Sequence, residues 1–229
     1  MSFFSRKKIG MVVCDMAGTI INEKGLIYKS IYDTLMKMGV RNISKIETYE
    51  WHGCDKSEVL GKYLKNIKDI KKAERILISN LRKQYFENNQ AEIINDELFD
   101  FFEKLRINNV KVCLNTGYPK KFQEEIITHF NISEHIDDYI SSEEVLLGRP
   151  YPYMIHNLME RNYIISSKNV MKIGDTVNDM MEGYNANCGE VIGVLTGADN
   201  KDDLIDGGAK SIVHKITDLK DCELPIFFL

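Results

Sequence analysis

The sequence predicts an α/β fold: a doubly wound parallel sheet into which a helical segment is inserted. Four short apolar runs end abruptly at glycine, aspartate, asparagine or threonine, and helical patterns lie between them. Runs that are apolar without alternation are typical of strands buried on both faces of a parallel sheet. The stretch 24–91 breaks this rhythm, because it contains helical patterns and no strand pattern. We therefore expect a sheet domain from residues 1–23 and 92–229 and a helical cap domain from residues 24–91.

The strands are predicted from the four apolar runs, at residues 9–14, 110–114, 170–173 and 191–195. Helices are predicted between them, at residues 97–106, 121–130, 153–161 and 178–185. Alternation of strands and helices favours parallel pairing, and ligands bind such sheets outside the carboxyl ends of the strands. The polar residues that end the four runs are therefore expected to meet at one crevice.

The segment 24–91 is predicted to be helical at residues 28–38, 56–66 and 71–88, where lysine and glutamate occupy the outer faces. Five lysines are concentrated in it: Lys62, Lys65, Lys68, Lys71 and Lys72. A lysine-rich stretch of this kind is typical of a solvated helix face.

Composition excludes several classes of protein. The 229 residues are 44% apolar and 28% charged, which is typical of a globular domain. A net charge of −4 provides no broad basic surface for nucleic acid, although a local site for a small anion stays open. No apolar run approaches the ~18 residues of a membrane span. The first apolar run stops at Asp15, too early for a signal peptide, so we expect a cytoplasmic protein.

The five cysteines are scattered and form no Cys-x-x-Cys pair. A disulfide framework or a structural zinc site is therefore not expected, and reduced thiols fit the cytoplasm. We interpret Cys14, Cys113 and Cys188 as small packing residues.

Two aspartates end buried strands. Asp15 closes the first run, and Asp175 follows the run at 170–173. If these strands are neighbours, the two carboxylates meet, and Asp179 faces the same way one helical turn later. A single aspartate is more often a turn former or a helix cap. Two of them at strand ends, each near glycine and threonine, favour a site for Mg²⁺, which binds oxygen ligands.

Two further segments are candidates for binding an anion. Thr116 and Gly117 supply a hydroxyl and backbone amides just before a helix. Arg149 stands between a glycine and a proline, and a guanidinium can bind phosphate through two hydrogen bonds. Taken separately, these segments also fit an ordinary strand–helix junction and a surface arginine.

Together and in this order, the segments resemble the haloacid dehalogenase superfamily, over nearly the whole chain outside the helical insertion. The matching motifs are the nucleophile loop from Asp15 to Thr19, the hydroxyl of Thr116, the basic residue Arg149, and Gly174-Asp175 with Asp179. The resemblance implies a Rossmann-like core with an inserted cap, and an aspartyl-phosphate formed on Asp15. It also implies Mg²⁺ held by Asp15, Asp175 and the Ala17 carbonyl, with Asp179 in support.

Position 17 separates the branches of this superfamily. Most members carry a second aspartate there, which protonates the departing alkoxide of a phosphate ester. Ala17 has no proton to give, and a missing general acid typically costs on the order of 10²–10⁴ in rate. Ala17, Gly18, Arg149 and the triplet Thr116-Gly117-Tyr118 resemble the phosphonatase branch, whose members cleave a carbon–phosphorus bond.

The same resemblance assigns a role to Lys56. In the phosphonatase branch a cap lysine forms a Schiff base with the substrate carbonyl, and Lys56 matches it by its spacing from Gly53. Such a lysine must lose its proton to attack, so its pKa must fall below the usual ~10.4. The chain departs from the branch at Val59, where a histidine is expected, and at His52, where a methionine is expected. His52 is a candidate for proton transfer, and a helix-capping histidine is the alternative.

The leading interpretation is a Mg²⁺-dependent hydrolase that uses an aspartyl-phosphate and cleaves a small 2-oxo-alkylphosphonate such as phosphonoacetaldehyde. The alternative is a phosphatase for small organic phosphate monoesters, in which Lys56 only binds substrate. A phosphate-sensing relative without activity is a third interpretation. The expected partner is a small phosphonate or phosphate, with no nucleic acid and no membrane, and a homodimer stays open.

Overall fold

The computed structural model describes residues 9–43 and 53–221. Its centre is a six-stranded sheet in the order β5-β4-β1-β6-β7-β8, in which every neighbouring pair is parallel. The strands are β1 (Met11–Asp15), β4 (Lys111–Thr116), β5 (Asp138–Ser141), β6 (Val170–Gly174), β7 (Glu190–Val194) and β8 (Ser211–Val213). The parallel α/β fold is therefore confirmed.

The strand β1 lies in the interior of the sheet, and all five of its residues are buried. It pairs with β4 on one side and with β6 on the other. In the register with β4, Asp15 lies opposite Asn115, and Cys14 lies opposite Ile173 of β6. The ends of the three strands therefore meet at one edge, as the sequence predicts.

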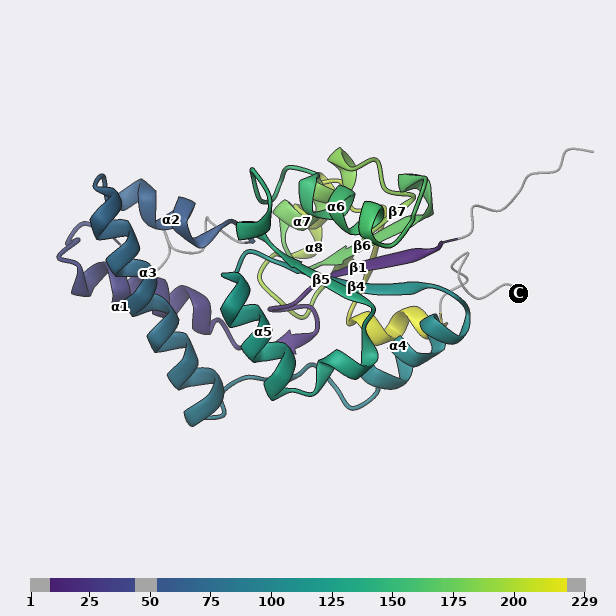
Figure 1. Ribbon diagram of the computed structural model, residues 1–229, viewed down its shortest axis with the longest axis horizontal. Coiled ribbons are helices and arrows are strands. Elements are labelled where there is room, and N and C mark those ends of the chain that lie inside the picture. The colour runs from purple at the N-terminus through teal and green to yellow at the C-terminus, as the bar shows by residue number, and fades with distance from the viewer. Residues whose placement is uncertain (1–8, 44–52, 222–229) are drawn as a thin grey trace, which may run out of the picture.

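Helices cover both faces of the sheet (Figure 1). The helices α4 (Leu98–Ile107) and α5 (Lys120–His129) lie on one face, and their apolar residues belong to the larger core. On the other face, α6 (Tyr153–Arg161), α7 (Val177–Asn185) and α8 (Lys201–Asp206) enclose a second apolar cluster. Short helices complete the layers: η3 (Ile132–His135), η4 (Ser142–Glu144), η5 (Ser167–Asn169) and η6 (Ile216–Asp221).

The inserted segment is helical and lies beyond the carboxyl ends of the sheet strands in Figure 1. It contains α1 (Leu26–Lys37), α2 (Lys56–Tyr63), α3 (Ile67–Arg82) and a π-helical turn, η2 (Lys83–Glu87). The helix α3 packs against both α1 and α2. Two short antiparallel strands, β2 (Ile21–Asn22) and β3 (Glu92–Ile93), connect the segment to the sheet. They flank the expected domain boundaries, and the division into two domains itself stays a prediction.

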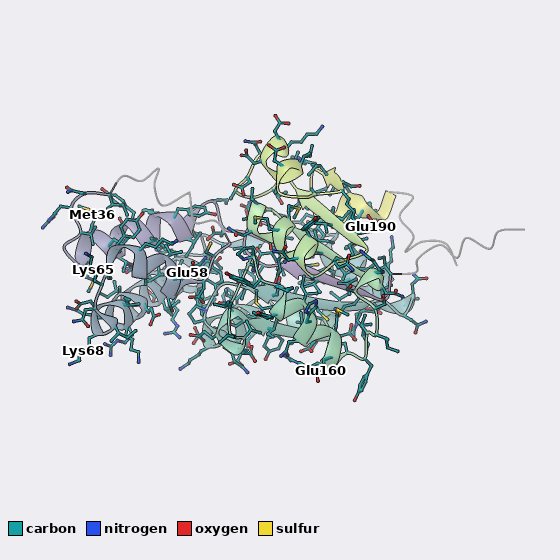
Figure 2. All side chains as sticks on the ribbon, turned by 90° about the horizontal axis from the view of Figure 1, so that it is seen from above. Met36, Glu58, Lys65, Lys68, Glu160 and Glu190 are labelled. Atoms are coloured by element: carbon teal, nitrogen blue, oxygen red, sulfur yellow. The ribbon has the colours of Figure 1, made fainter. Side chains whose placement is uncertain are left out.

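The side chains of the insertion follow the predicted pattern. The five lysines of the basic stretch are all exposed, and Figure 2 shows Lys65 and Lys68 at the end of the insertion remote from the sheet. The interpretation of this stretch as a solvated face is thereby confirmed. Within the described residues, no helix has the length and apolar character that crossing a membrane requires.

Besides the short β2–β3 pair, two strands of the six-stranded sheet, β5 and β8, were absent from the sequence prediction. Both lie at edges of the sheet, where one side of a strand faces solvent. The strand β5 has only two apolar residues between polar ends, and β8 is only three residues long, so neither forms an apolar run. The third cap helix also differs, because α3 ends at Arg82 and the π-helical turn that follows buries Tyr85.

Candidate active site

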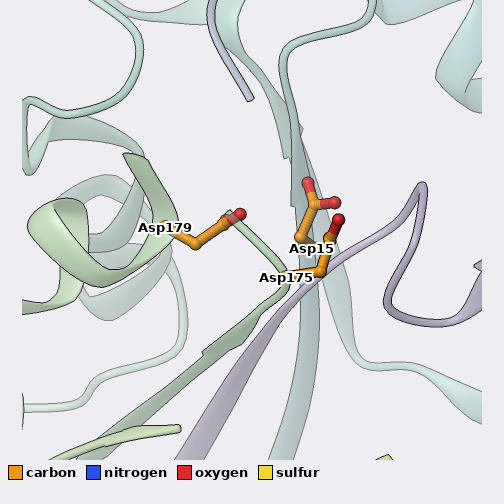
Figure 3. Close-up of side chains that lie close together, drawn as sticks. All are labelled: Asp15, Asp175 and Asp179. Atoms are coloured by element: carbon orange, nitrogen blue, oxygen red, sulfur yellow. The ribbon is translucent and has the colours of Figure 1, made fainter. Parts of the chain in front are cut away.

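Three buried carboxylates meet where β1 and β6 end. Asp15 is the last residue of β1, Asp175 follows β6, and Asp179 lies in the first turn of α7. Each offers an oxygen within 4.8 Å of the others. Figure 3 shows Asp15 and Asp175 side by side, with the Asp179 side chain extending from its helix toward them. The predicted convergence of these three residues is therefore observed.

The local fold holds Asp175 in place with little room around it. Its carboxylate accepts hydrogen bonds from the Thr19 hydroxyl and the Ala198 amide, each at 2.9 Å. A Cβ at Gly18 would lie 2.3 Å from this carboxylate, and one at Gly197 would lie 1.9 Å from it. Gly18 also has a φ of 84°, in the left-handed region that favours glycine. Glycine at both positions therefore lets the two loops approach Asp175.

The donor set fits a hard divalent cation. Burial raises the pKa of Asp175 well above its usual range, and repulsion from Asp15 adds to this effect. A cation between the two carboxylates would relieve that repulsion, and carboxylate oxygens are ligands that Mg²⁺ prefers. Ala17, whose carbonyl is the further predicted ligand, lines a cavity together with Asp15 and Asp175.

Arg149 is buried between two of the carboxylates, with 2% of its surface exposed. Its Nη2 lies 2.5 Å from Oδ1 of Asp15, and its Nη1 lies 2.6 Å from Oδ1 of Asp179. Burial raises the pKa of Asp15, and the charge of Arg149 opposes this rise. Burial would also raise the pKa of Asp179, but the charges of Arg149 and Lys172 outweigh it and lower the pKa. Because Arg149 is buried, the alternative that it is a surface arginine is wrong.

Sequence reasoning missed a second buried cation, Lys172 on β6. Its Nζ lies 2.8 Å from Asp179 and 3.1 Å from Glu182, and it donates a hydrogen bond of 2.7 Å to Asn115. A fully buried lysine requires such partners, because an unpaired charge in the interior is costly. The available signal was the single charged residue within the apolar run at 170–173.

A cavity of about 290 Å³ joins this cluster to the inserted helices. Nine predicted site residues line it: Asp15, Ala17, Gly18, Lys56, Thr116, Gly117, Tyr118, Arg149 and Asp175. The remaining acid, Asp179, contacts Arg149 and Lys172 instead. His52 lies outside the described residues.

The loop after β4 forms the floor of the cavity against the insertion. The Thr116 hydroxyl accepts a hydrogen bond of 3.2 Å from the Tyr118 amide. A Cβ at Gly117 would lie 2.6 Å from the carbonyl oxygen of Cys54, so the two backbones approach closely. Asp55 caps α2 and accepts a hydrogen bond of 2.6 Å from the Ser142 hydroxyl. The start of α2 is thereby attached to the sheet edge.

Lys56, the first residue of α2, extends into this cavity with only 8% of its surface exposed. Its Nζ donates a hydrogen bond of 2.8 Å to the Cys54 carbonyl and lies 5.7 Å from the centre of the Tyr118 ring. Burial lowers the pKa of Lys56, and the positive charge of Arg149 contributes in the same direction. The alternative of a solvated helix lysine is therefore wrong.

Glu23 is a cavity residue that the sequence analysis did not select. It follows β2, is 5% exposed, and accepts a hydrogen bond of 3.0 Å from the Ile27 amide. The hydroxyls of Tyr85 and Tyr118 each donate to it at 3.4 Å. Burial raises its pKa to about 7. No local pattern could reveal this cluster, because its members are up to 95 residues apart.

A sequence profile of the haloacid dehalogenase-like hydrolases matches residues 12–194 of this chain. The chain belongs to the haloacid dehalogenase-like hydrolase family. Among curated relatives, the phosphonoacetaldehyde hydrolase of Latilactobacillus sakei is 26% identical over 202 residues, which cover 82% of this hydrolase and 74% of that protein. The phosphonoacetaldehyde hydrolases of Bacillus cytotoxicus and Parabacteroides distasonis are 34% and 37% identical, over segments that span 36% of each relative.

Solved structures share the fold of this haloacid dehalogenase-like hydrolase. A phosphonoacetaldehyde hydrolase-like protein of Oleispira antarctica aligns with a TM-score of 0.78 and 20% identity, covering 96% of this chain and 93% of that one. A predicted phosphoglycolate phosphatase of Haemophilus somnus aligns with a TM-score of 0.76 and 17% identity, covering 93% and 97%. At these identities the alignments establish the common fold.

Proposed function

We propose that this hydrolase is Mg²⁺-dependent and cleaves the carbon–phosphorus bond of a small 2-oxo-alkylphosphonate such as phosphonoacetaldehyde. The observation that carries the proposal is the position of Lys56. This buried amine, whose pKa is lowered by burial, lines the same cavity as Asp15. Beside them stands Ala17, which cannot protonate an ester leaving group. Relatives named phosphonoacetaldehyde hydrolase support the same chemistry.

On the phosphorus side, an Asp15 oxygen would attack the phosphonate as the bond from phosphorus to carbon breaks. Arg149 would hold the phosphonate oxygens, as would the amides after Thr116. Asp15, Asp175 and the Ala17 carbonyl would hold Mg²⁺, which offsets the negative charge of the phosphonate when bound. The product on the enzyme is an aspartyl-phosphate, which water hydrolyses to free the carboxylate.

On the carbon side, neutral Lys56 would attack the substrate carbonyl and form an iminium with loss of water. When the carbon–phosphorus bond breaks, its electron pair moves toward the iminium nitrogen and leaves an enamine on Lys56. Without the iminium the carbon fragment would depart as an enolate anion, which is a poorer leaving group than the neutral enamine. A carboxylic acid at position 17 is unnecessary in this scheme, which agrees with Ala17.

The alternative function is that of a phosphatase for small organic phosphate monoesters. The hydrogen bond from Lys56 to the Cys54 carbonyl and its contact with the Tyr118 ring are also the contacts of a charged ammonium. A charged Lys56 would hold an anionic substrate without bonding to it. The two functions therefore differ in the protonation state of one lysine.

Release of phosphate from phosphonoacetaldehyde, compared with release from a panel of phosphate monoesters, tests the proposal. Borohydride reduces an iminium to a stable amine and leaves a non-covalent contact unchanged. We expect treatment with phosphonoacetaldehyde and borohydride to inactivate the enzyme and to add a substrate or product fragment to Lys56, as seen by mass spectrometry. Phosphate release from monoesters alone, without this adduct, would establish the phosphatase instead.

We also propose a cytoplasmic enzyme whose partner is its small substrate. Cys14, Cys54, Cys113 and Cys188 carry free thiols, which agrees with a reducing compartment. Cys222 lies outside the described residues. Gel filtration coupled to light scattering would separate a monomer from a homodimer.

A further inference from the structure

A carboxyl group and two phenol hydroxyls form a buried cluster in the wall of the cavity. Oε2 of Glu23 accepts hydrogen bonds of 3.4 Å from both Tyr85 and Tyr118, and the two hydroxyls lie 3.2 Å apart. The same oxygen accepts the Ile27 amide at 3.0 Å. The cluster unites the start of α1, the turn η2 and the loop after β4. These contacts fix the carboxyl group at the cavity surface.

The cluster adjoins Lys56 through one shared residue. The Tyr118 ring centre lies 5.7 Å from the Lys56 Nζ, and the hydroxyl of the same ring contacts Glu23. Glu23 and Lys56 both line the cavity, and the charge of Lys56 opposes the rise in the pKa of Glu23. A carbonyl compound that reaches the Lys56 nitrogen therefore occupies the cavity that the Glu23 carboxyl group also lines.

Several elements contribute groups that bear on the charge of Glu23. The groups that face it are Lys56 from α2, Tyr85 from η2, Tyr118 after β4, and Tyr28 with the Ile27 amide from α1. Lys24, the adjacent residue, instead pairs with Glu92 at 3.1 Å and is largely exposed. Burial raises the pKa of Glu23 to about 7, so both of its protonation states are populated near neutral pH.

The other titratable groups of the cavity are less suited to proton transfer at Lys56. Burial raises the pKa of Tyr28 and of Tyr118 far above neutral, so both phenols keep their protons. Arg149 stays charged at all relevant pH values. Asp15 and Asp175 belong to the nucleophile and cation cluster. Among the described residues, Glu23 is the carboxyl group on the lysine side of the cavity.

We propose that Glu23 is the general acid–base that forms and hydrolyses the imine on Lys56. This inference rests on the proposed carbon–phosphorus hydrolase and adds to it a residue with a defined task. It also explains how imine chemistry proceeds in a chain that has Val59, and no titratable group, one helical turn after Lys56.

In this role Glu23 exchanges protons with both the carbonyl oxygen and the Lys56 nitrogen. The lone pair of neutral Lys56 forms a bond to the carbonyl carbon, and the carbonyl oxygen takes the proton of Glu23. The resulting carboxylate removes a proton from the nitrogen and returns it to the hydroxyl, which leaves as water while the carbon–nitrogen double bond forms. The site then holds a cationic iminium beside an anionic Glu23. After the phosphorus has departed, the enamine takes a proton from solvent at carbon and becomes an iminium again. Water adds to this iminium, and the Glu23 carboxylate takes up the proton that is released as the carbonyl product forms and Lys56 is freed.

The test replaces the proton donor and keeps its shape. Glu23→Gln can still accept from the Ile27 amide and has no acidic proton. Each enzyme is mixed with phosphonoacetaldehyde and quenched into borohydride at successive times, and the fraction of Lys56 carrying the adduct is measured by mass spectrometry. We expect adduct formation to slow by about 100-fold or more in Glu23→Gln. Glu160→Gln, on the exposed surface of α6, is the matched control and should keep the rate of the unaltered enzyme.

The outcomes separate this inference from the proposed function. No adduct in the unaltered enzyme would refute the imine and, with it, both proposals. Adduct formation at equal rates in the unaltered enzyme and Glu23→Gln would overturn the role of Glu23 and leave the imine intact. Adduct formation that is slow in Glu23→Gln and fast in both the unaltered enzyme and Glu160→Gln supports the role of Glu23 as general acid–base.

The pH profile adds a measurement that a purely structural role would not change. The rate of adduct formation should rise with pH as Lys56 loses its proton and fall again as Glu23 loses its own. Glu23→Gln should lack the falling limb, and a retained limb would overturn the assignment. If Glu23→Gln does not fold, Glu23→Asp serves instead, because its different carboxyl pKa should move that limb. An unmoved limb in Glu23→Asp would likewise overturn it.

Discussion

The Nη2 of Arg149 lies 2.5 Å from Oδ1 of Asp15, with both side chains buried. The same guanidinium reaches Asp179 at 2.6 Å, so one cation links the first strand of the sheet to helix α7. An ion pair taken out of water stabilises a protein only when its geometry is good and its partners are complete. Asp15 therefore has two tasks, as the proposed nucleophile and as a counter-ion of Arg149.

Asp15→Asn should abolish turnover while the chain still folds. The amide keeps the size of the carboxylate and lacks the charge that attacks phosphorus. Asp179 still pairs with Arg149, and the repulsion of Asp175 is removed, so the loss of one counter-ion is partly offset. The checks are phosphate release and thermal unfolding, with the exposed Asp100→Asn on α4 as control. Turnover near that of the control would contradict the aspartyl-phosphate mechanism.

Ala17→Asp should lower the rate on phosphonoacetaldehyde. A further carboxylate would enter a cavity that already contains Asp15 and Asp175, and it would compete for Mg²⁺ and crowd the substrate. On a monoester with a poor leaving group, the same change should raise the rate, because it supplies a general acid. Steady-state kinetics of both proteins on both substrates is the measurement. A faster rate on the phosphonate would count against carbon–phosphorus cleavage.

Lys56→Arg should reduce phosphonoacetaldehyde hydrolysis by about 100-fold or more, because a guanidinium stays protonated and forms no imine. Lys62→Arg, on the exposed side of the same helix, should be unaffected. Rates and borohydride trapping of both variants provide the check. If Lys56→Arg retains most of the activity, Lys56 acts as an anion-binding residue and the phosphatase is favoured.

Glu23 should make stability depend on pH. Burial raises its pKa from 4.5 to about 7 in the folded protein. A carboxyl group with a raised folded pKa stabilises the fold fully below its unfolded pKa, and this stabilisation is lost as pH rises from 4.5 toward 7. Glu23→Gln does not titrate, so its free energy of unfolding relative to the unaltered protein should increase over that range, by on the order of 3 kcal/mol.

Urea unfolding at pH 5 and at pH 8 measures this change. The exposed Glu160→Gln should keep a constant difference from the unaltered protein at the two pH values. If the difference in free energy of unfolding between Glu23→Gln and the unaltered protein is also the same at both pH values, the Glu23 carboxyl group has the same pKa in the folded and unfolded chain.

The features that could be predicted from the sequence are those that depend on a short, continuous segment of the chain. The strands β1 and β6 form apolar runs because both of their faces are buried, and Asp15 and Asp175 were predicted from their positions at the ends of these runs. The edge strand β8 lacks this signal because it is half exposed. Lys172 stood within one of the runs, where a charge signals a buried partner.

The features that could not be predicted depend on packing between segments that are distant in the sequence. Glu23 meets Tyr85 across 62 residues of sequence, and this contact requires both the β2–β3 connection and the π-helical turn. Neither feature has a pattern in the sequence. Lys56 is buried because the start of α2 packs against the segment after β5, where Ser142 donates a hydrogen bond to Asp55. The spacing of Lys56 from Gly53 in the sequence could therefore suggest its function but could not show that it is buried.

The close approach of Gly117 to the Cys54 carbonyl is made by main-chain atoms on both sides. Rotating a side chain cannot enlarge the cavity at this point, and a Cβ at position 117 would collide with the Cys54 carbonyl oxygen. The separation of these two loops is therefore set by the backbone path, whereas side chains such as Tyr28, Lys56 and Tyr118 line other parts of the cavity. Moving these two loops apart would require insertions or deletions in the segments around Gly53 or Gly117, whereas point substitutions can change the volume only where side chains line the cavity.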